Sequence, residues 1–247
     1  FFPSYIVVGA YLIVGAMLFD ALDGRLARLA RRTSEFGAQL DSVADVVSFG
    51  AAPVLLFLTL ALGGAAPGGG GEPYVSGLEW NVALLGALVY VSCAAIRLAR
   101  YNAENVKGEE AQQQFSGLPV PGAAAALVAL LVLHQHVALV LAPGDPHWEN
   151  LLRWALGPTA LALGLLMVSR LDYVHVFNVY VRREQPLSHL VLLVLVLALV
   201  WRWPQFVLAV AAFSYVVSGF VLNLRRQRGV RRAETSDAAT RTPVDMN

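Results

Sequence analysis

About seven apolar segments, most of them long enough to cross a lipid bilayer as a helix, dominate this chain of 247 residues. They run roughly over residues 4–30, 37–62, 80–103, 119–141, 151–170, 187–202 and 204–224. Within hydrocarbon every backbone N–H and C=O needs an internal partner, so such segments fold as helices. A hydrophobic content of 57% and a mean hydropathy of +0.60 exclude a soluble two-layer domain. The sequence therefore predicts an all-α fold, a polytopic transmembrane helix bundle, over residues 1–224.

The end of the chain has a different composition. Residues 225–247 are polar, begin with a basic cluster and contain few apolar side chains. Such a segment cannot bury enough apolar surface to offset its loss of conformational entropy. We predict a basic, disordered cytoplasmic tail, whose Arg residues either flank the last membrane segment or hold anionic lipid head groups.

Four carboxylates, Asp20, Asp23, Asp41 and Asp45, lie at the edges of otherwise apolar segments. The first pair is spaced i, i+3 and the second i, i+4, so on helices each pair shares one face. An ionised Asp near hydrocarbon costs about 2.5–3.5 kcal/mol, so four together require a compensating cation. Oxygen ligands without His or Cys suit a hard divalent ion such as Mg²⁺ or Mn²⁺.

The distribution of basic residues predicts the orientation. Although the formal net charge is only +1, every Lys and Arg except Arg153 and Arg202 follows the first, third or fifth segment or lies in the tail. By the positive-inside rule this side faces the cytoplasm. The Asp pairs lie at the same side. We therefore expect a multi-pass protein of the cell (inner) membrane whose active site faces the cytoplasm.

The spacing D-x2-D-G-x2-A-R-x8-G-x3-D-x3-D over residues 20–45 resembles the signature of the CDP-alcohol phosphotransferase family at every position. The resemblance implies a phosphotransferase that cleaves a CDP-linked lipid at its pyrophosphate and releases CMP. It also implies a homodimer and no nucleic-acid partner. Members of the family have one more helix before the first Asp pair, so we expect a native N-terminal helix to be missing from this sequence.

The resemblance also assigns roles within the motif. Asp20, Asp23 and Asp41 are implied metal ligands for two divalent ions, Mg²⁺ or Mn²⁺. Asp45 is an implied weaker ligand and the general base that accepts the proton of the acceptor hydroxyl. The implied nucleotide-binding positions for the CDP-lipid are Gly24, Ala27, Arg28 and Gly37.

Three further stretches resemble the membrane-embedded bacterial and archaeal phosphatidylserine synthase branch of this family. They are Ser34–Pro53, R-L-A-R-Y-N at Arg97–Asn102 and F-S-G-L-P-V-P at Phe115–Pro121. This implies CDP-diacylglycerol and L-serine as substrates, with membrane lipids around the protein. Serine carries a carboxylate, which a planar guanidinium pairs with well, so Arg97, Arg100 and Asn102 are the candidate acceptor-binding residues. Interfacial anchoring by the two Arg residues is the alternative interpretation.

Three other functions fit the sequence less well. A sister enzyme that uses glycerol 3-phosphate or inositol phosphate needs a denser basic pocket, because its acceptor brings an extra phosphate. A divalent-cation transporter needs carboxylates along a path, yet all four Asp residues gather near one face. A structural scaffold leaves the cost of the charges unexplained.

Overall fold

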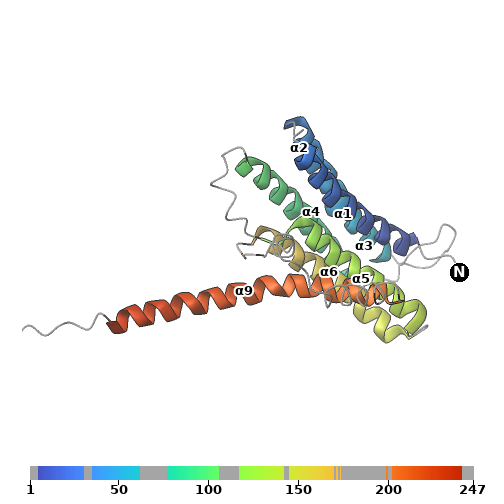
Figure 1. Ribbon diagram of the computed structural model, residues 1–247. Coiled ribbons are helices and arrows are strands. Elements are labelled where there is room, and N and C mark those ends of the chain that lie inside the picture. Colours follow the sequence, from blue (N-terminus) through green and yellow to red (C-terminus); the bar gives the residue numbers. More distant parts are fainter. Residues whose placement is uncertain are drawn as a thin grey trace, which may run out of the picture.

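The computed structural model describes residues 5–30, 35–61, 77–105, 117–141, 145–169, 171, 173, 199 and 202–240. These residues form helices and no strands (Figure 1). The elements are α1 (Tyr5–Ala30), α2 (Glu35–Asp45), the π-helix η1 (Val46–Ala51), α3 (Ala52–Ala61), α4 (Gly77–Asn105), α5 (Val120–His136), the π-helix η3 (Val137–Leu141), α6 (Pro146–Val168) and α9 (Pro204–Thr240).

The predicted membrane bundle is confirmed. Among the described residues, six helical stretches are long and apolar enough to cross a membrane. They are Tyr5–Asp23, Gln39–Ala61, Gly77–Ala103, Val120–Leu141, Asn150–Val168 and Pro204–Val221, in good agreement with the predicted segments. The predicted segment 187–202 lies almost entirely outside the described residues.

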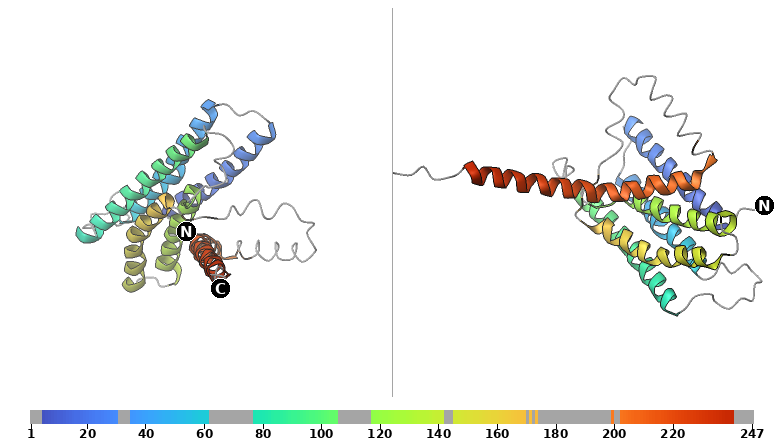
Figure 2. Two further views of the ribbon diagram at one scale, coloured as in Figure 1. Left: turned by 90° about the vertical axis from the view of Figure 1, so that its left-hand side faces the viewer. Right: turned by 90° about the horizontal axis from the view of Figure 1, so that it is seen from below.

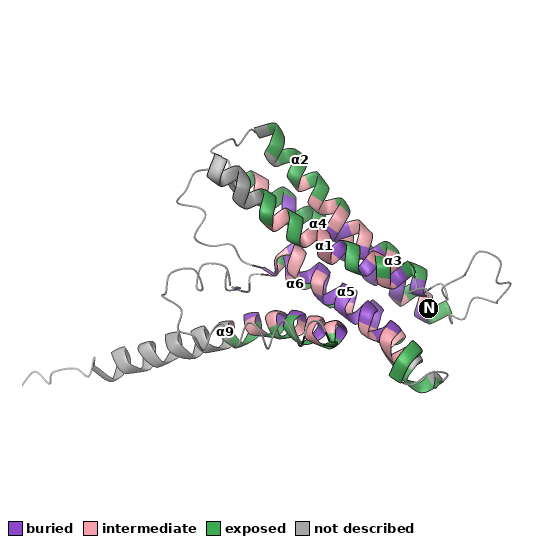
Figure 3. Ribbon diagram, turned by 45° about the vertical axis from the view of Figure 1, so that its right-hand side comes forward, coloured by how far each residue is buried: buried purple, intermediate pink, exposed green. Residues whose placement is uncertain are grey.

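Helix α5 forms the centre of the bundle and is buried over most of its length (Figure 3). Helices α1, α6 and α9 pack against it. A helix that is apolar on all sides is stable only when other helices or lipid cover it. Seven of its side chains have no exposed surface: Ala123, Ala124, Ala126, Leu127, Val128, Ala129 and Leu131.

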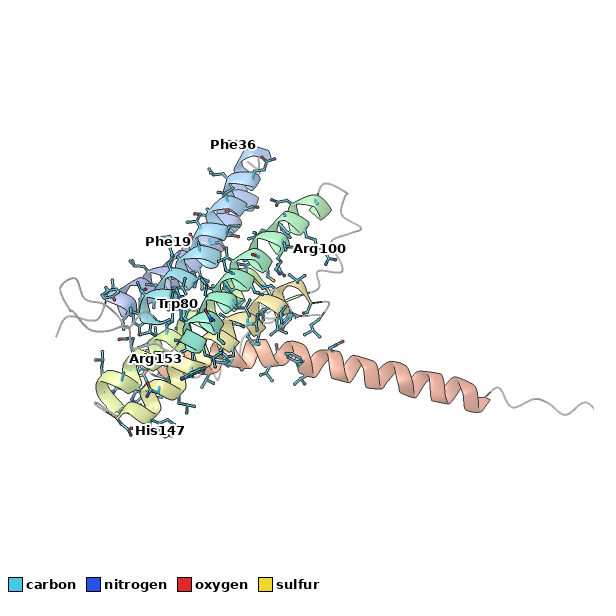
Figure 4. The ribbon with its side chains drawn as sticks, turned by 180° about the vertical axis from the view of Figure 1, so that it is seen from behind. Phe19, Phe36, Trp80, Arg100, His147 and Arg153 are labelled. Atoms are coloured by element: carbon cyan, nitrogen blue, oxygen red, sulfur yellow. The ribbon has the colours of Figure 1, made fainter. Side chains whose placement is uncertain are left out.

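The helices alternate in direction. Gly86 of α4 faces Gly157 of α6, and further along both helices Tyr90 faces Gly164, so α4 and α6 are parallel. Helix α5 runs the other way between them in sequence. One end of the bundle, here called the motif end, therefore holds the ends of α1 and α4 and the starts of α2 and α5 (Figures 1 and 2). Arg100 lies toward this end and Arg153 toward the opposite end (Figure 4).

A buried ion pair joins α4 to α6 at the opposite end. The Nε of Arg153 lies 3.1 Å from Oε1 of Glu79, and both side chains are about nine-tenths buried. Each charge offsets the desolvation of the other, because either one alone would be costly in an apolar bundle. This explains why Arg153 is found on the side that the positive-inside rule leaves nearly free of basic residues.

The sequence predicts a disordered tail from residue 225, whereas the structure describes residues 225–240 as helical. Helix α9 continues through these residues to Thr240 and extends well beyond the bundle (Figure 1). The stretch holds five Arg and three Ala, which favour helix, and it contains no Pro. A helix already formed in the membrane segment extends residue by residue without a new nucleation step. A polar composition excludes a packed core but not the continuation of an existing helix. Residues 241–247 lie outside the described part.

The contact between Gly86 and Gly157 generates a stability prediction. A Cβ on Gly86 would overlap the carbonyl oxygen of Gly157, so Gly86→Ala forces α4 and α6 apart. We expect a loss of about 1–3 kcal/mol in the free energy of unfolding, the usual cost of overpacking. Thermal unfolding of the purified protein in detergent measures it.

Gly15→Ala is the matched control for this change. Gly15 is also in a helix, but a Cβ there meets no atom within 4 Å. Alanine is the better helix former, so the midpoint of unfolding should stay the same or rise slightly. Equal effects of the two substitutions would contradict the close helix contact.

Candidate active site

Helix α1 carries the first Asp pair near its C-terminal end. Asp20 is half-buried and Asp23, one turn later, is exposed. The predicted nucleotide-binding residues Gly24, Ala27 and Arg28 follow on the same helix before it ends at Ala30. One continuous helix therefore presents five of the motif positions in fixed register.

Helix α2 carries the second pair. Gly37 and Asp41 are exposed, and Asp45, which is half-buried, is the last residue of this α-helix. Asp20 experiences charge repulsion from Asp41, and Asp45 experiences it from both Asp20 and Asp41. The two Asp pairs thus lie at the same end of the bundle and close enough to interact.

This cluster has the donor chemistry of a divalent-metal site, because it offers only hard carboxylate oxygens whose mutual repulsion a cation would relieve. Within the described residues, however, no three His, Cys, Asp or Glu side chains converge closely enough to hold a metal ion. The structure places Asp20 within range of repulsion by Asp41 and Asp45 but does not close these carboxylates around a common point.

A π-helix begins at the residue after Asp45. It spans Val46–Ala51, and its residues Phe49 and Gly50 are buried against the bundle. The hydroxyl of Tyr90 on α4 donates a 3.0 Å hydrogen bond to the carbonyl of Phe49. Tyr90 is fully buried. Short π-helical stretches are rare and often occur at functional sites. Here the stretch lies between the acidic helix α2 and its apolar continuation, α3.

Sequence reasoning missed the π-helix and the role of Tyr90. No spacing rule separates a π-helical turn from an α-helical one, because the difference lies in one shifted backbone bond per turn. The phenol in the middle of an apolar segment was the one available signal, since a buried Tyr hydroxyl usually has a partner.

A second contact joins the acidic helix to α4. The hydroxyl of Ser42, the residue after Asp41, donates a 3.1 Å hydrogen bond to Oδ1 of Asn102. Both residues are half-buried. Asn102, a predicted acceptor-binding residue, is therefore in contact with the Asp-bearing helix.

Arg97 lies on another face of α4. Its Nη2 donates a 3.1 Å hydrogen bond to the carbonyl of Gly117, and its Nε is buried without a hydrogen-bond partner among the described residues. Arg100 is exposed. At 100° per residue, Arg97 and Arg100 are about 60° apart around the helix, whereas Asn102 is about 140° from Arg97. The three predicted acceptor residues thus form two groups.

The carbonyl that Arg97 binds belongs to a strained turn before α5. Gly117 has a φ of +101°, and a Cβ there would overlap the carbonyl oxygen of Met167. Its amide donates a 2.7 Å hydrogen bond to Leu171, and the amide of Leu118 donates a 3.0 Å bond to Leu166. Only glycine fits this close backbone approach. Arg97 therefore links α4 to a turn that is fixed on the end of α6.

Comparisons with known proteins show which family this sequence resembles. The sequence profile of the CDP-alcohol phosphatidyltransferase family matches residues 1–166. The chain is 35% identical over 162 residues to a CDP-diacylglycerol–serine O-phosphatidyltransferase of Methanocaldococcus jannaschii, covering 66% of this chain and 61% of that protein. It is 34% identical over 215 residues to the protein of the same name from Helicobacter pylori, covering 87% of this chain and 79% of that protein.

A protein of the same name from Mycobacterium bovis is 34% identical over 162 residues, covering 64% of this chain. The match spans only 48% of the mycobacterial protein, so the chain aligns with about half to three fifths of the M. bovis and M. jannaschii relatives. No solved structure matches this chain.

The hydrogen bond at the π-helix generates a second stability prediction. Tyr90→Phe removes the buried donor to the Phe49 carbonyl and leaves that carbonyl without it. We expect a loss of about 1–3 kcal/mol in the free energy of unfolding. The midpoint of thermal unfolding in detergent measures it.

Tyr11→Phe is the control, because Tyr11 is 40% exposed and its ring stays in place. If both variants unfold like the wild type, the hydrogen bond does not stabilise the π-helix.

Proposed function

This chain belongs to the CDP-alcohol phosphatidyltransferase family, and we propose that it transfers a phosphatidyl group from CDP-diacylglycerol to L-serine. The serine hydroxyl oxygen forms a new bond to the lipid-linked phosphorus. The pyrophosphate bond to the cytidylate breaks, and the products are phosphatidylserine and CMP. The observation that carries the proposal is the meeting of the two Asp pairs, from α1 and α2, at one end of a membrane bundle.

The metal centre is part of the proposal. Asp20, Asp23, Asp41 and Asp45 would hold two divalent ions, Mg²⁺ or Mn²⁺, since their carboxylate oxygens suit hard cations. When bound, the ions neutralise the pyrophosphate and the charge that develops in phosphoryl transfer.

Two groups of side chains act on the CDP-lipid and the proton. We propose that Gly24, Ala27 and Gly37 let the nucleotide approach the backbone, and that Arg28 binds a phosphate through two N–H groups. Asp45 accepts the proton that the serine hydroxyl loses. Its place at the junction of α2 and η1 fixes its backbone against the bundle, which helps to orient the carboxylate.

Arg97 is the best-supported residue for the serine carboxylate. One of its N–H groups already binds Gly117, which fixes the guanidinium plane. Its buried Nε–H has no acceptor among the described residues, and a buried donor left without a partner is costly. A substrate carboxylate would accept this hydrogen bond. Arg100, one turn further along α4, would add charge on the same side.

The setting of the reaction follows from the charge pattern of the chain. We propose a multi-pass protein of the inner membrane with the motif end at the cytoplasm, because nearly all its basic residues belong to that side. Soluble serine and released CMP would then exchange with the cytosol while the lipids stay in the membrane. A homodimer is also part of the proposal.

Release of CMP from CDP-diacylglycerol tests the proposed function. The purified protein should release CMP and form phosphatidylserine when Mg²⁺ or Mn²⁺ and serine are both present, and a chelator should stop the reaction. Turnover of glycerol 3-phosphate or inositol phosphate in place of serine would move the protein to a sister activity. Metal transport into vesicles without CMP release would refute the phosphotransferase proposal altogether.

A substitution at the proposed base gives a specific prediction. Asp45→Asn should abolish phosphatidylserine formation, because an amide cannot accept the hydroxyl proton at neutral pH. Binding of CDP-diacylglycerol, measured by equilibrium binding, should stay within a few-fold, because the other three carboxylates remain. An equally large loss of CDP-lipid binding would make Asp45 a metal ligand only.

A substitution at Arg97 tests the acceptor assignment. Arg97→Ala should lower kcat/KM for serine about 10- to 150-fold, the loss expected for a charge-assisted hydrogen bond of about 1.5–3 kcal/mol. The affinity for CDP-diacylglycerol should not change. Serinamide, which lacks the carboxylate charge, should be a poor substrate of the wild type, and the variant should discriminate less against it.

Arg202→Ala is the matched control for this test. Arg202 is exposed just before α9, at the opposite end of the bundle, with its guanidinium over Trp203. Its removal should leave the kinetics with serine unchanged. If Arg97→Ala lowers turnover of serine and serinamide equally, Arg97 supports the Gly117 turn and does not bind the carboxylate.

A further inference from the structure

Helix α2 has little apolar packing of its own to hold it in place. Phe36, Leu40 and Val43 are all more than half exposed, at 75%, 58% and 61%. The helix projects at the motif end as one of the most exposed parts of the bundle (Figure 3). Its position, and with it the position of Asp41 and Asp45, must therefore depend on a small number of specific contacts.

Two contacts join this region to the same partner helix, α4, one from α2 and one from the following π-helix η1, and they flank Asp45 in the sequence. On one side the Ser42 hydroxyl donates to Asn102, at 3.1 Å. On the other side Tyr90 donates to the Phe49 carbonyl, at 3.0 Å. A rigid helical segment that is held at two points can neither slide along its partner nor rotate about its own axis. The two bonds to α4 therefore set the direction in which Asp45 projects.

We propose that Asn102 and Ser42 are a pair of positioning residues for the phosphatidyl transfer, which act by fixing the rotation of α2 and thereby aligning Asp41 and Asp45. This inference rests on the proposed function. It changes the role of Asn102, which sequence patterning assigned to serine binding. Its amide oxygen is engaged by Ser42, and it lies about 140° around α4 from Arg97, the residue we propose for the serine carboxylate.

Kinetics of Ser42→Ala, Asn102→Ala and the double variant test the proposal. Each single substitution should lower kcat about 2- to 13-fold, the range that the net contribution of one neutral hydrogen bond allows. The KM for serine should stay within about twofold. The double variant should be no slower than the slower single variant, because both changes remove the same bond.

Conservative and control variants separate positioning from a general loss of structure. Ser42→Thr retains the hydroxyl and should restore most of kcat. Ser92→Ala and Asn81→Ala change exposed residues of the same types on α4, away from this contact, and should behave like the wild type. Two results together would overturn the proposal in favour of direct acceptor binding. The KM for serine would rise with Asn102→Ala but not with Ser42→Ala, and the effects of the two single substitutions would multiply in the double variant.

A crosslinking experiment tests the contact without relying on the reaction. Cys93 is first replaced by Ala, so that no native thiol competes. A short bifunctional thiol reagent should then crosslink the double variant Ser42→Cys, Asn102→Cys in membranes, and it should not crosslink Ser42→Cys, Asn81→Cys. Absence of the 42–102 product would refute the pairing even if the enzyme is active. If the crosslink forms in a protein that does not use serine as acceptor, the serine assignment is wrong and the contact between Ser42 and Asn102 is correct. The same single and double variants, assayed with the acceptor that the enzyme does use, then decide whether the pair positions α2.

Discussion

Bringing four carboxylates to the edge of an apolar bundle is the constraint on which the rest of this structure depends. Asp20, Asp41 and Asp45 repel one another, and the apolar side chains Phe36, Leu40 and Val43 of α2 are more than half exposed. Such a cluster persists only where a cation or a charged substrate relieves it, or where rigid helices force it to persist. The bundle provides the rigidity: α5 is buried at the centre, and α4 lies parallel to α6 at glycine contacts too close for any larger side chain.

Helix α4 connects these two requirements. Its first half is fixed to α6 through Gly86 and through the ion pair of Glu79 with Arg153. Its middle binds the π-helix η1 at Phe49, and its second half binds α2 at Ser42 and the Gly117 turn through Arg97. One helix of 29 residues thus contacts the segment that carries Asp41 and Asp45 and also carries Arg97, the residue proposed to bind the serine carboxylate. A change in the packing of α4 would disturb both groups at once.

Much of the fold could be predicted from the sequence because the bilayer leaves few alternatives. Runs of apolar residues long enough to cross a bilayer fold as helices whatever their neighbours are, so six of the seven predicted segments agree with the spans found among the described residues. The pairing of Asp20 with Asp23 and of Asp41 with Asp45 followed from helical periodicity alone. The helical description of residues 225–240 could not be predicted in this way, since composition reports the absence of a core and not the propagation of an existing helix.

The sequence by itself determined the helical membrane architecture, the acidic motif and the family, because hydrophobic length and residue spacing are local properties. Only the tertiary structure decided what Tyr90, Asn102 and Arg97 contact. Those contacts join residues 41, 60 and 20 positions apart, and they depend on how neighbouring helices are rotated about their axes. Rotation is set by close packing of small side chains such as Gly86 and by one π-helical turn after Asp45, and neither effect has a periodic signature along the chain.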